Sequence, residues 1–516
     1  ACVQNIHAEE RQRPNIIVIL VDDMGYSDIG CYGGEIRTPH LDALAQGGLR
    51  FTQFYNTGRC CPTRASLMTG LHPHQAGIGH MTETPEAPSP MPNQPYQGYL
   101  NKQCTTLAEV LKASGYHTLM TGKWHLGYHD TENWPLQRGF DKYFGIISGA
   151  SHFMNPQPPR GLTFMNEPFD PWPGFYTTDA FTDMAMRFIR EATMEEEKPF
   201  FLYLAYNAPH WPLHAHAEDI ERYDGAYDEG YEALRKARYR RQLEIGLFDE
   251  EVTPLSEPEH RIWSTLSEKE RKEEALRMQI HAAMVDRMDQ NVGRLVKRLE
   301  ERGQLEETLI IFLVDNGASH ERPRRGSKDP SAEWGSVGSF EVIGQSWANA
   351  ANSPLRKWKV QGLEGGICTP MIAHWPAGID LPKDAISREP CHLVDFVPTF
   401  MELAGEGTRY PKNLPRPDGV SLTPTFSGKE LNREKPLFFQ YGSWQAIREG
   451  PWKLVRQKTN PWALYDLSRD RTETRNLASS FPERVTGMGN RWEEWDREMN
   501  LATSKGPRKK KHKSTQ

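Results

Sequence analysis

The stretch that decides the fold is Asn15-Ile16-Ile17-Val18-Ile19-Leu20-Val21, and it is followed at once by Asp22-Asp23. A continuous run of large, mostly β-branched residues is typical of a strand buried on both faces, as the strands of parallel sheets are. Runs of the same kind recur further along the chain, at 200–205 and 309–314, with shorter ones at 117–120 and 370–373. The sequence therefore predicts a sheet with several buried, parallel strands.

Helical patterns lie between these runs. They cover residues 38–48, 107–114 and 267–303, the last with apolar side chains at three- and four-residue intervals. Ser267 and Glu270 have the spacing of a capping box, which predicts where that helix begins. The alternation of strands and helices predicts an α/β fold, with a large, mostly parallel or mixed central sheet flanked by helices.

Two stretches interrupt the alternation and are interpreted as insertions. Residues 128–176 are rich in Pro, Gly, Trp and Phe and show little periodicity, whereas residues 214–265 are charged. Long irregular segments often shape binding sites, although a surface elaboration without a role is an equal alternative. The aromatic rings of the first stretch, Trp134 and Trp172 among them, would suit one wall of a substrate pocket.

The pattern changes after residue 433. Short apolar runs separated by Gly and Pro occupy 437–441, 445–448, 452–456 and 463–467, and a helical pattern follows at 482–499. These features predict a small α+β subdomain with an antiparallel sheet. We expect three parts: a main domain 14–433, this subdomain 434–500 and a basic tail 501–516. The tail is either a solvated, disordered end or a handle for an anionic polymer.

Composition excludes several classes of protein. With 62 Lys and Arg against 68 Asp and Glu among 516 residues, the net charge of −6 gives no indication of nucleic-acid binding. No apolar run approaches the ~18 residues of a transmembrane segment. The seven cysteines are odd in number, scattered and without a CxxC pair, so we expect no disulfide framework, zinc ribbon or thioredoxin motif. Residues 1–14 lack the apolar core of a signal peptide, so such a leader never existed or is removed or omitted here.

Carboxylates directly follow two of the predicted buried strands. Asp22-Asp23 comes after the first strand, and Asp315-Asn316-Gly317 comes after the run at 309–314. Ligands of parallel α/β sheets bind at this end of the strands, and adjacent carboxylates repel one another unless a cation or basic group lies between them. Hard oxygen donors suit Ca²⁺ or Mg²⁺. Taken alone, each group of residues is also compatible with a turn or a helix cap.

A second unusual feature is Cys60-Cys61-Pro62-Thr63-Arg64-Ala65-Ser66-Leu67-Met68-Thr69-Gly70. Pro62 suits the first turn of a helix and Gly70 suits its end. Cys60 would then lie just before a helix N-terminus, where backbone amides and the helix dipole favour an anion. Arg64 would lie one turn away. A vicinal disulfide and a pair of buried thiols are the alternatives for the two cysteines.

The pattern Cys60-x-Pro62-x-Arg64, ending in Thr69-Gly70, resembles the signature of the type I sulfatases of the alkaline-phosphatase superfamily, in which the first cysteine is oxidised to Cα-formylglycine. Further segments resemble family motifs in the same order: Gly122-Lys123-Trp124-His125-Leu126-Gly127, Ala208-Pro209-His210, Asp315-Asn316-Gly317, and residues 353–359 with Glu364-Gly365-Gly366. The resemblance spans roughly residues 14–478. It implies an alkaline-phosphatase-like fold and an arylsulfatase-type sulfuric ester hydrolase, with the main domain catalytic.

The resemblance also implies roles for individual residues. Asp22, Asp23, Asp315 and Asn316, together with the formylglycine made from Cys60, would bind one Ca²⁺ per chain. Arg64 and Lys123 would hold and polarise the formylglycine, and His125 would be the base that deprotonates its second hydroxyl. His210 and Lys359 would contact the sulfate, with His210 as general acid. A formylglycine-generating maturation enzyme is the implied partner, and a periplasmic or secreted location is the implied compartment.

Two positions depart from the family pattern. Cys61 replaces the more usual Ser or Thr, so two adjacent cysteines could be the residue that is oxidised. The spacing along the sequence to Pro62 and Arg64 identifies Cys60 as that residue. Cys368 stands where many members carry a basic residue, and its small side chain would remove a substrate contact.

The resemblance implies hydrolysis of sulfate monoesters, of aryl or carbohydrate alcohols, to the alcohol and inorganic sulfate. A phosphonate or phosphate ester hydrolase on the same scaffold is the nearest alternative, although no second metal-ligand cluster is evident to balance the higher charge of a phosphate monoester. A non-catalytic protein that binds sulfated glycans through the basic tail and aromatic loops is the alternative from another class.

Overall fold

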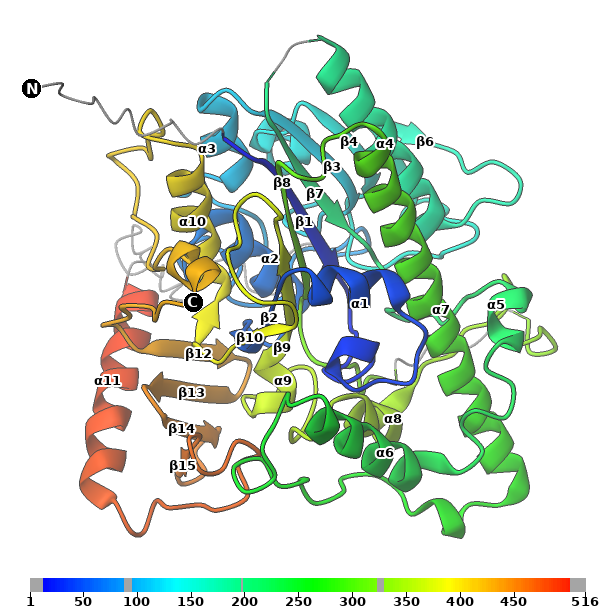
Figure 1. The fold of residues 1–516 in the computed structure, drawn as a ribbon, viewed down its shortest axis with the longest axis vertical. Coiled ribbons are helices and arrows are strands. Elements are labelled where there is room, and N and C mark those ends of the chain that lie inside the picture. Colours follow the sequence, from blue (N-terminus) through cyan, green and yellow to red (C-terminus); the bar gives the residue numbers. More distant parts are fainter. Residues whose placement is uncertain (1–12, 88–94, 196–197, 323–328, 502–516) are drawn as a thin grey trace, which may run out of the picture.

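The computed structural model describes residues 13–87, 95–195, 198–322 and 329–501. They form a large mixed sheet in the strand order β10-β2-β9-β8-β1-β7-β3-β4-β5-β6, with β11 beside β2 (Figure 1). Its strands are β1 (Asn15–Val21), β2 (Leu49–Tyr55), β3 (His117–Lys123), β4 (Lys142–Ile146), β5 (Leu162–Phe164), β6 (Glu167–Phe169), β7 (Phe200–Ala205), β8 (Thr308–Val314), β9 (Cys368–His374), β10 (Ala385–Ser387) and β11 (Cys391–His392). The predicted α/β fold is confirmed.

Strand β1 lies in the middle of the sheet, parallel to both of its neighbours, β7 and β8. Its side chains alternate between two cores, as the two-residue period of a strand requires. Ile17, Ile19 and Val21 belong to one core, whereas Ile16, Val18 and Leu20 belong to the other. The apolar run is continuous because both faces of the sheet are covered.

Helices cover the two faces. They are α1 (Pro39–Gln46), α2 (Cys60–Thr69), α3 (Leu107–Ala113), α4 (Thr177–Glu195), α5 (Ala217–Glu221), α6 (Gly230–Glu244), α7 (Glu268–Glu301), α8 (Gly344–Ala351), α9 (Glu364–Ile367) and α10 (Phe396–Leu403). Helices α4 and α7 contribute to the same core as Ile17, and α2, α3 and α10 to the same core as Val18. The capping box of Ser267 and Glu270 at the start of α7 is confirmed.

The expected irregularity of two segments is wrong. Residues 128–176 contain strands β4, β5 and β6 of the central sheet, and residues 214–265 contain helices α5 and α6. Strands β5 and β6 are each three residues long, too short to show a two-residue period. Helix α2 begins at Cys60 itself, one residue earlier than expected.

A four-stranded antiparallel sheet lies beside the main sheet (Figure 1), as predicted for this part of the chain. It consists of β12 (Leu437–Tyr441), β13 (Trp444–Glu449), β14 (Trp452–Gln457) and β15 (Ala463–Asp466), followed by α11 (Pro482–Leu501). Ile447 and Leu454 pack against α11, whereas Ala446 and Val455 join the core of the main sheet. The division at 433/434 stays a prediction, and the tail beyond residue 501 lies outside the described residues.

No helix among the described residues combines the length and the apolar character needed to cross a membrane.

Candidate functional site

The ends of β1 and β8 bring the predicted metal ligands together. The two strands are parallel and in register, with Val21 opposite Val314, so the residues that follow them leave the sheet side by side. The backbone N–H of Asp23 donates to Asp315 Oδ1 at 3.2 Å. Asp23 has a left-handed φ of 67°, which a non-glycine residue adopts at a cost. We call Asp22, Asp23, Asp315 and Asn316, with the cations paired to them, the strand-end cluster.

Two oxygen atoms of this cluster lack a partner. Asp22 Oδ1 and Asn316 Oδ1 are buried and accept no hydrogen bond from the described residues. Leaving a buried acceptor unpaired costs about 1–3 kcal/mol, so such atoms call for a ligand. Both are hard oxygen donors, and the Asn316 amide is fixed with its N–H on Asp23 Oδ1 at 2.7 Å. The donor set therefore fits Ca²⁺ or Mg²⁺.

Buried cations compensate the carboxylates. Lys123 Nζ lies 2.5 Å from Asp22 Oδ2, and Lys359 Nζ lies 2.6 Å from Asp23 Oδ1. Arg64 donates to Asp315 Oδ2 at 3.2 Å and to the Lys123 carbonyl at 2.8 Å. All three cationic side chains are almost completely buried, where they can also hold an anion that enters the cluster.

The Asp22 and Asp315 carboxylates lie close together, and their pKa values shift in opposite directions. Burial raises the pKa of Asp22, but the Lys123 ammonium, with His210 and Arg64, outweighs burial and holds that pKa well below its usual range. Burial and the Asp22 carboxylate raise the pKa of Asp315 far above its usual range, more than Arg64 lowers it. A further cation would allow both carboxylates to ionise.

Cys60 lies at the first position of α2 and faces this cluster. Its sulfur lies within 4.8 Å of a His125 ring nitrogen and of the Cys61 sulfur. The negative charge of a Cys60 thiolate contributes to raising the pKa of Asp22 and of Asp315, so Cys60 lies near both carboxylates. A hydrogen bond from Cys61 lowers the pKa of Cys60 more than burial raises it, and the Lys123 ammonium lowers it further. The pKa of Cys60 is therefore far below its usual value. Residue 60 therefore occupies an anion-favouring position.

Besides its hydrogen bond to Cys60, Cys61 makes its other contacts away from the strand-end cluster. Its thiol is directed at the His80 carbonyl and Met81 Sδ, both at 3.6 Å, and burial raises its pKa. The two cysteines are free thiols, so the vicinal disulfide is not present. The choice of Cys60 over Cys61 as the residue that is oxidised stays a prediction.

The two predicted histidines border the cluster from different strands. His125 follows β3 with a φ of 58°, and burial lowers its pKa to about 4. His210 follows β7, and its Nδ1 donates to the Trp211 carbonyl at 2.6 Å, which leaves Nε2 facing Asp23 Oδ2 at 3.4 Å. Burial lowers the pKa of His210, although Asp23 opposes that change.

The structure thus brings all the predicted site residues into one cluster: Asp22, Asp23, Cys60, Arg64, Lys123, His125, His210, Asp315, Asn316 and Lys359. Sequence reasoning missed Glu321, which pairs with Lys359 at 3.3 Å and with Arg59 at 2.6 Å. Glu321 follows Asp315 by six residues, but no motif or periodicity marks it.

Two expectations about substrate contacts stay predictions. A cavity lined in part by residues 150–160 has the indole of Trp211 in its wall, and Trp134 and Trp172 are not among its lining residues. Cys368 is buried, and Arg471 donates to its sulfur at 3.2 Å, so this residue belongs to the contact with the C-terminal sheet.

Comparison with known proteins gives consistent matches. A family profile described as "Sulfatase" matches residues 14–406, and one described as "N-sulphoglucosamine sulphohydrolase, C-terminal" matches residues 360–487. A sulfatase of Schizosaccharomyces pombe is 34% identical over 96% of this chain and 95% of its own length. An arylsulfatase of Klebsiella aerogenes is 35% identical over 77% of this chain and 88% of its own.

Solved structures agree. The crystal structure of Ps i-CgsB in complex with k-i-k-neocarrahexaose superposes with a TM-score of 0.70 and 27% identity, over 94% of this chain and 93% of that chain.

Proposed function

The chain belongs to the sulfatase family of sulfuric ester hydrolases, and within it we propose that this chain hydrolyses aryl or carbohydrate sulfate monoesters through a formylglycine made from Cys60, beside a bound Ca²⁺. One observation carries the proposal. Asp22 and Asn316, which follow the neighbouring strands β1 and β8, each have a buried side-chain oxygen without a hydrogen-bond partner. The Cys60 side chain faces the cluster that contains these two oxygens.

Asp22, Asp23, Asp315 and Asn316 would hold the ion, with the modified residue 60 as a further ligand. When bound, Ca²⁺ would act as a Lewis acid toward the sulfate oxygens. The lysine and arginine side chains that now neutralise these carboxylates would then be released in part to hold the sulfate. Lys359 suits this role because Asp23 keeps its pKa well above its usual value despite burial, so it stays cationic.

The first step would transfer the sulfuryl group to residue 60. A hydrated formylglycine at residue 60 would supply the nucleophile: one of its hydroxyls would lose its proton to water, its oxygen would bond to sulfur, and the bond between sulfur and the ester oxygen would break. His210 would donate a proton from Nε2 to the leaving oxygen in its doubly protonated form, which burial disfavours and the Asp23 carboxylate at 3.4 Å favours. Arg64 and Lys123 hold the side chain of residue 60 in place.

The second step would release sulfate. His125 would take the proton of the remaining hydroxyl, so that the aldehyde C=O of a formylglycine could re-form as the bond between its carbon and the sulfate oxygen breaks. The low pKa of His125, about 4, keeps its ring neutral and able to accept that proton at neutral pH. Serine could not follow this route because it has no second hydroxyl.

Rates on three matched esters test the proposal. The protein matured on Cys60 should turn over an aryl sulfate faster than the corresponding phosphate monoester or diester, and a chelator should abolish turnover until Ca²⁺ is returned. Faster turnover of the diester would instead assign a phosphoryl hydrolase. No turnover of any ester by protein with a formylglycine at residue 60 would favour a glycan-binding role.

We further propose, from family membership, that a formylglycine-generating enzyme matures the chain and that the protein works in the periplasm or outside the cell. Cell fractionation of the native host, with detection of the protein by antibody, checks the location; a purely cytoplasmic signal would contradict it.

A further inference from the structure

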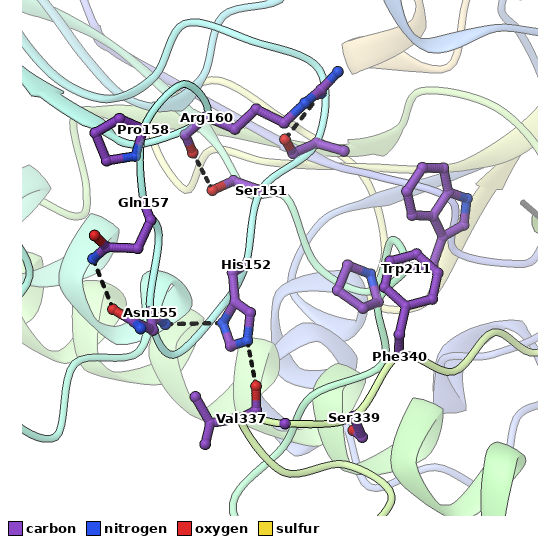
Figure 2. A pocket seen from close by; sticks show the side chains of 13 residues that line it. Ser151, His152, Asn155, Gln157, Pro158, Arg160, Trp211, Val337, Ser339 and Phe340 are labelled. Atoms are coloured by element: carbon purple, nitrogen blue, oxygen red, sulfur yellow. Dashed lines mark hydrogen bonds between the residues drawn. The ribbon is translucent and has the colours of Figure 1, made fainter. Parts of the chain in front are cut away.

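A cavity of about 590 Å³ is lined by residues between 150 and 160, by Trp211 and Pro212, and by residues 337–340 (Figure 2). Two of its lining residues adjoin the predicted catalytic histidines. Trp211 follows His210, and their ring centroids lie 4.4 Å apart. Ala150 follows Gly149, where a Cβ would come within 2.4 Å of His125 Nε2, so this backbone lies against the His125 ring. The cavity is therefore the space next to both histidines.

Apolar groups form much of the cavity wall. The rings of Trp211 and Phe340 lie 5.8 Å apart and tilted, on the same side of the cavity in Figure 2. Val337 is 54% exposed, which is unusual for a large apolar side chain, and Pro158 and Pro212 add further carbon surface. An exposed apolar surface of this kind beside a site marks a place where an apolar ligand part binds.

Arg160 lines the cavity, but its charge is already neutralised. Its Nε and one terminal nitrogen donate to the two Glu86 oxygens, both at 2.8 Å, and the other terminal nitrogen donates to the Ala150 carbonyl at 3.2 Å. This bidentate pair holds the guanidinium in one orientation. An anionic ligand part would have to displace Glu86 to gain a partner.

His152 is the other described lining residue that could carry charge, and its contacts make the ring neutral. Nδ1 accepts hydrogen bonds from the backbone N–H groups of Met154 and Asn155, at 3.1 and 2.9 Å, so it carries no proton. Nε2 therefore carries the proton and donates to the Val337 carbonyl at 2.8 Å. When Glu86 is counted with its ion-pair partner Arg160, the described groups at the cavity thus offer no net positive charge.

We propose that this cavity receives the alcohol part of the substrate and selects an uncharged aromatic or apolar alcohol over one with a second anionic group. The inference rests on the proposed sulfatase function and deepens it. Trp211 and Phe340 provide the stacking surface, and Glu86 acts as the selectivity residue because it withholds the Arg160 charge from the ligand.

Two aryl sulfates test the proposal: phenyl sulfate and para-carboxyphenyl sulfate. The wild-type protein should favour phenyl sulfate in kcat/KM by at least tenfold. Glu86→Gln frees Arg160 and should reduce that preference at least tenfold, mainly by lowering KM for the carboxylated ester. Comparing the ratio between variants cancels the different leaving-group chemistry of the two phenols.

Matched controls separate the outcomes. Glu301→Gln removes a glutamate from an exposed pair with Arg298 and should leave the ratio unchanged. Val337→Lys adds a cation at an exposed position of the wall and should shift the ratio in the same direction as Glu86→Gln, which covers the case in which Glu86→Gln does not fold. An unchanged ratio in both folded variants would overturn the cavity assignment. Failure of the sulfatase proposal looks different, because the wild-type protein would then cleave neither ester.

Discussion

Two buried ionic clusters can be compared in this molecule. One is the strand-end cluster. The other, the junction cluster, lies where the antiparallel sheet meets the main sheet. It consists of Tyr55, Glu364, Arg448, Lys453, Arg471 and Glu473, all buried. In the junction cluster both oxygens of Glu364 are paired, Oε1 with Lys453 at 2.8 Å and Oε2 with Tyr55 at 2.8 Å and with Arg471.

The difference lies in the unpaired atoms. The junction cluster also ties Glu473 Oε2 to the backbone N–H of Glu364 at 2.8 Å, so its charges bind one another and hold two sheets together. The strand-end cluster leaves oxygens of Asp22 and Asn316 without a partner. The junction cluster also has a buried oxygen without a hydrogen bond, Glu473 Oε1, but Lys453 Nζ lies 2.8 Å from it as an ion-pair partner. Burial and charge density are common to both clusters. What distinguishes the strand-end cluster is that Asp22 Oδ1 and Asn316 Oδ1 have neither a hydrogen bond nor a cation among the described residues.

The largest expected effect comes from the residue that faces the strand-end cluster. Cys60→Ala should lower kcat by at least about 10³-fold, because the nucleophile is lost. The melting temperature should change little. Steady-state rates on an aryl sulfate check this, with Cys61→Ser as the matched control, which should retain activity within tenfold. Equal losses in both variants would contradict the assignment of Cys60.

His210→Gln should lower the rate by about 10²–10⁴-fold on a sulfate ester of an alkyl alcohol, which needs a proton on its leaving oxygen. The loss should be much smaller on para-nitrophenyl sulfate, whose phenolate leaves without help. Rates on a series of esters with leaving groups of different basicity measure this. A loss that is the same for every leaving group would remove His210 from the role of general acid.

A pair of variants separates the two clusters. Lys453→Met should destabilise the protein by about 3–5 kcal/mol, because it leaves buried carboxylates unpaired. Asn316→Ala should instead abolish the stabilisation given by Ca²⁺, which is about 2.7 kcal/mol at an ion concentration one hundred times Kd. Thermal melts with and without Ca²⁺ measure both.

The crossed result is the control. Lys453→Met should keep the full Ca²⁺-dependent rise in melting temperature, and Asn316→Ala should lose it. If wild-type protein shows no such rise, or if Asn316→Ala keeps it, the unpaired oxygens of the strand-end cluster are not metal ligands.

The last expected effect is a pH dependence of the contact between the main domain and the C-terminal sheet. Burial lowers the pKa of His74 from 6.5 to about 4, and its ring lies 5.7 Å from that of Trp495 on α11. As pH falls, His74 binds a proton in the unfolded chain before it does so in the folded protein. The free energy of unfolding is therefore greatest above pH 6.5 and decreases toward pH 4, by at most about 3 kcal/mol. His74→Asn should reduce the fall of the melting temperature over this range, while other buried histidines such as His125 keep part of it. The exposed His129→Asn should not, and a matching change in both variants would contradict the assignment.

Sequence reasoning located the strand-end cluster because its ligands follow long apolar runs. The runs at 15–21 and 309–314 mark β1 and β8. Because these strands are parallel neighbours, the residues that follow them lie at the same edge of the sheet. The same reasoning missed strands such as β5, whose three residues show no period. It also missed Glu321 and the junction cluster, because contacts between residues far apart in sequence leave no local pattern.

The central claim is that residue 60 is a formylglycine beside the ligands on β1 and β8. Mass spectrometry of the peptide that contains residue 60, from active protein purified from its native host, tests this most directly. The account predicts an aldehyde at residue 60, trapped by a hydrazide, and an unmodified thiol at Cys61. An intact thiol at Cys60 in protein that still cleaves sulfate esters would contradict it.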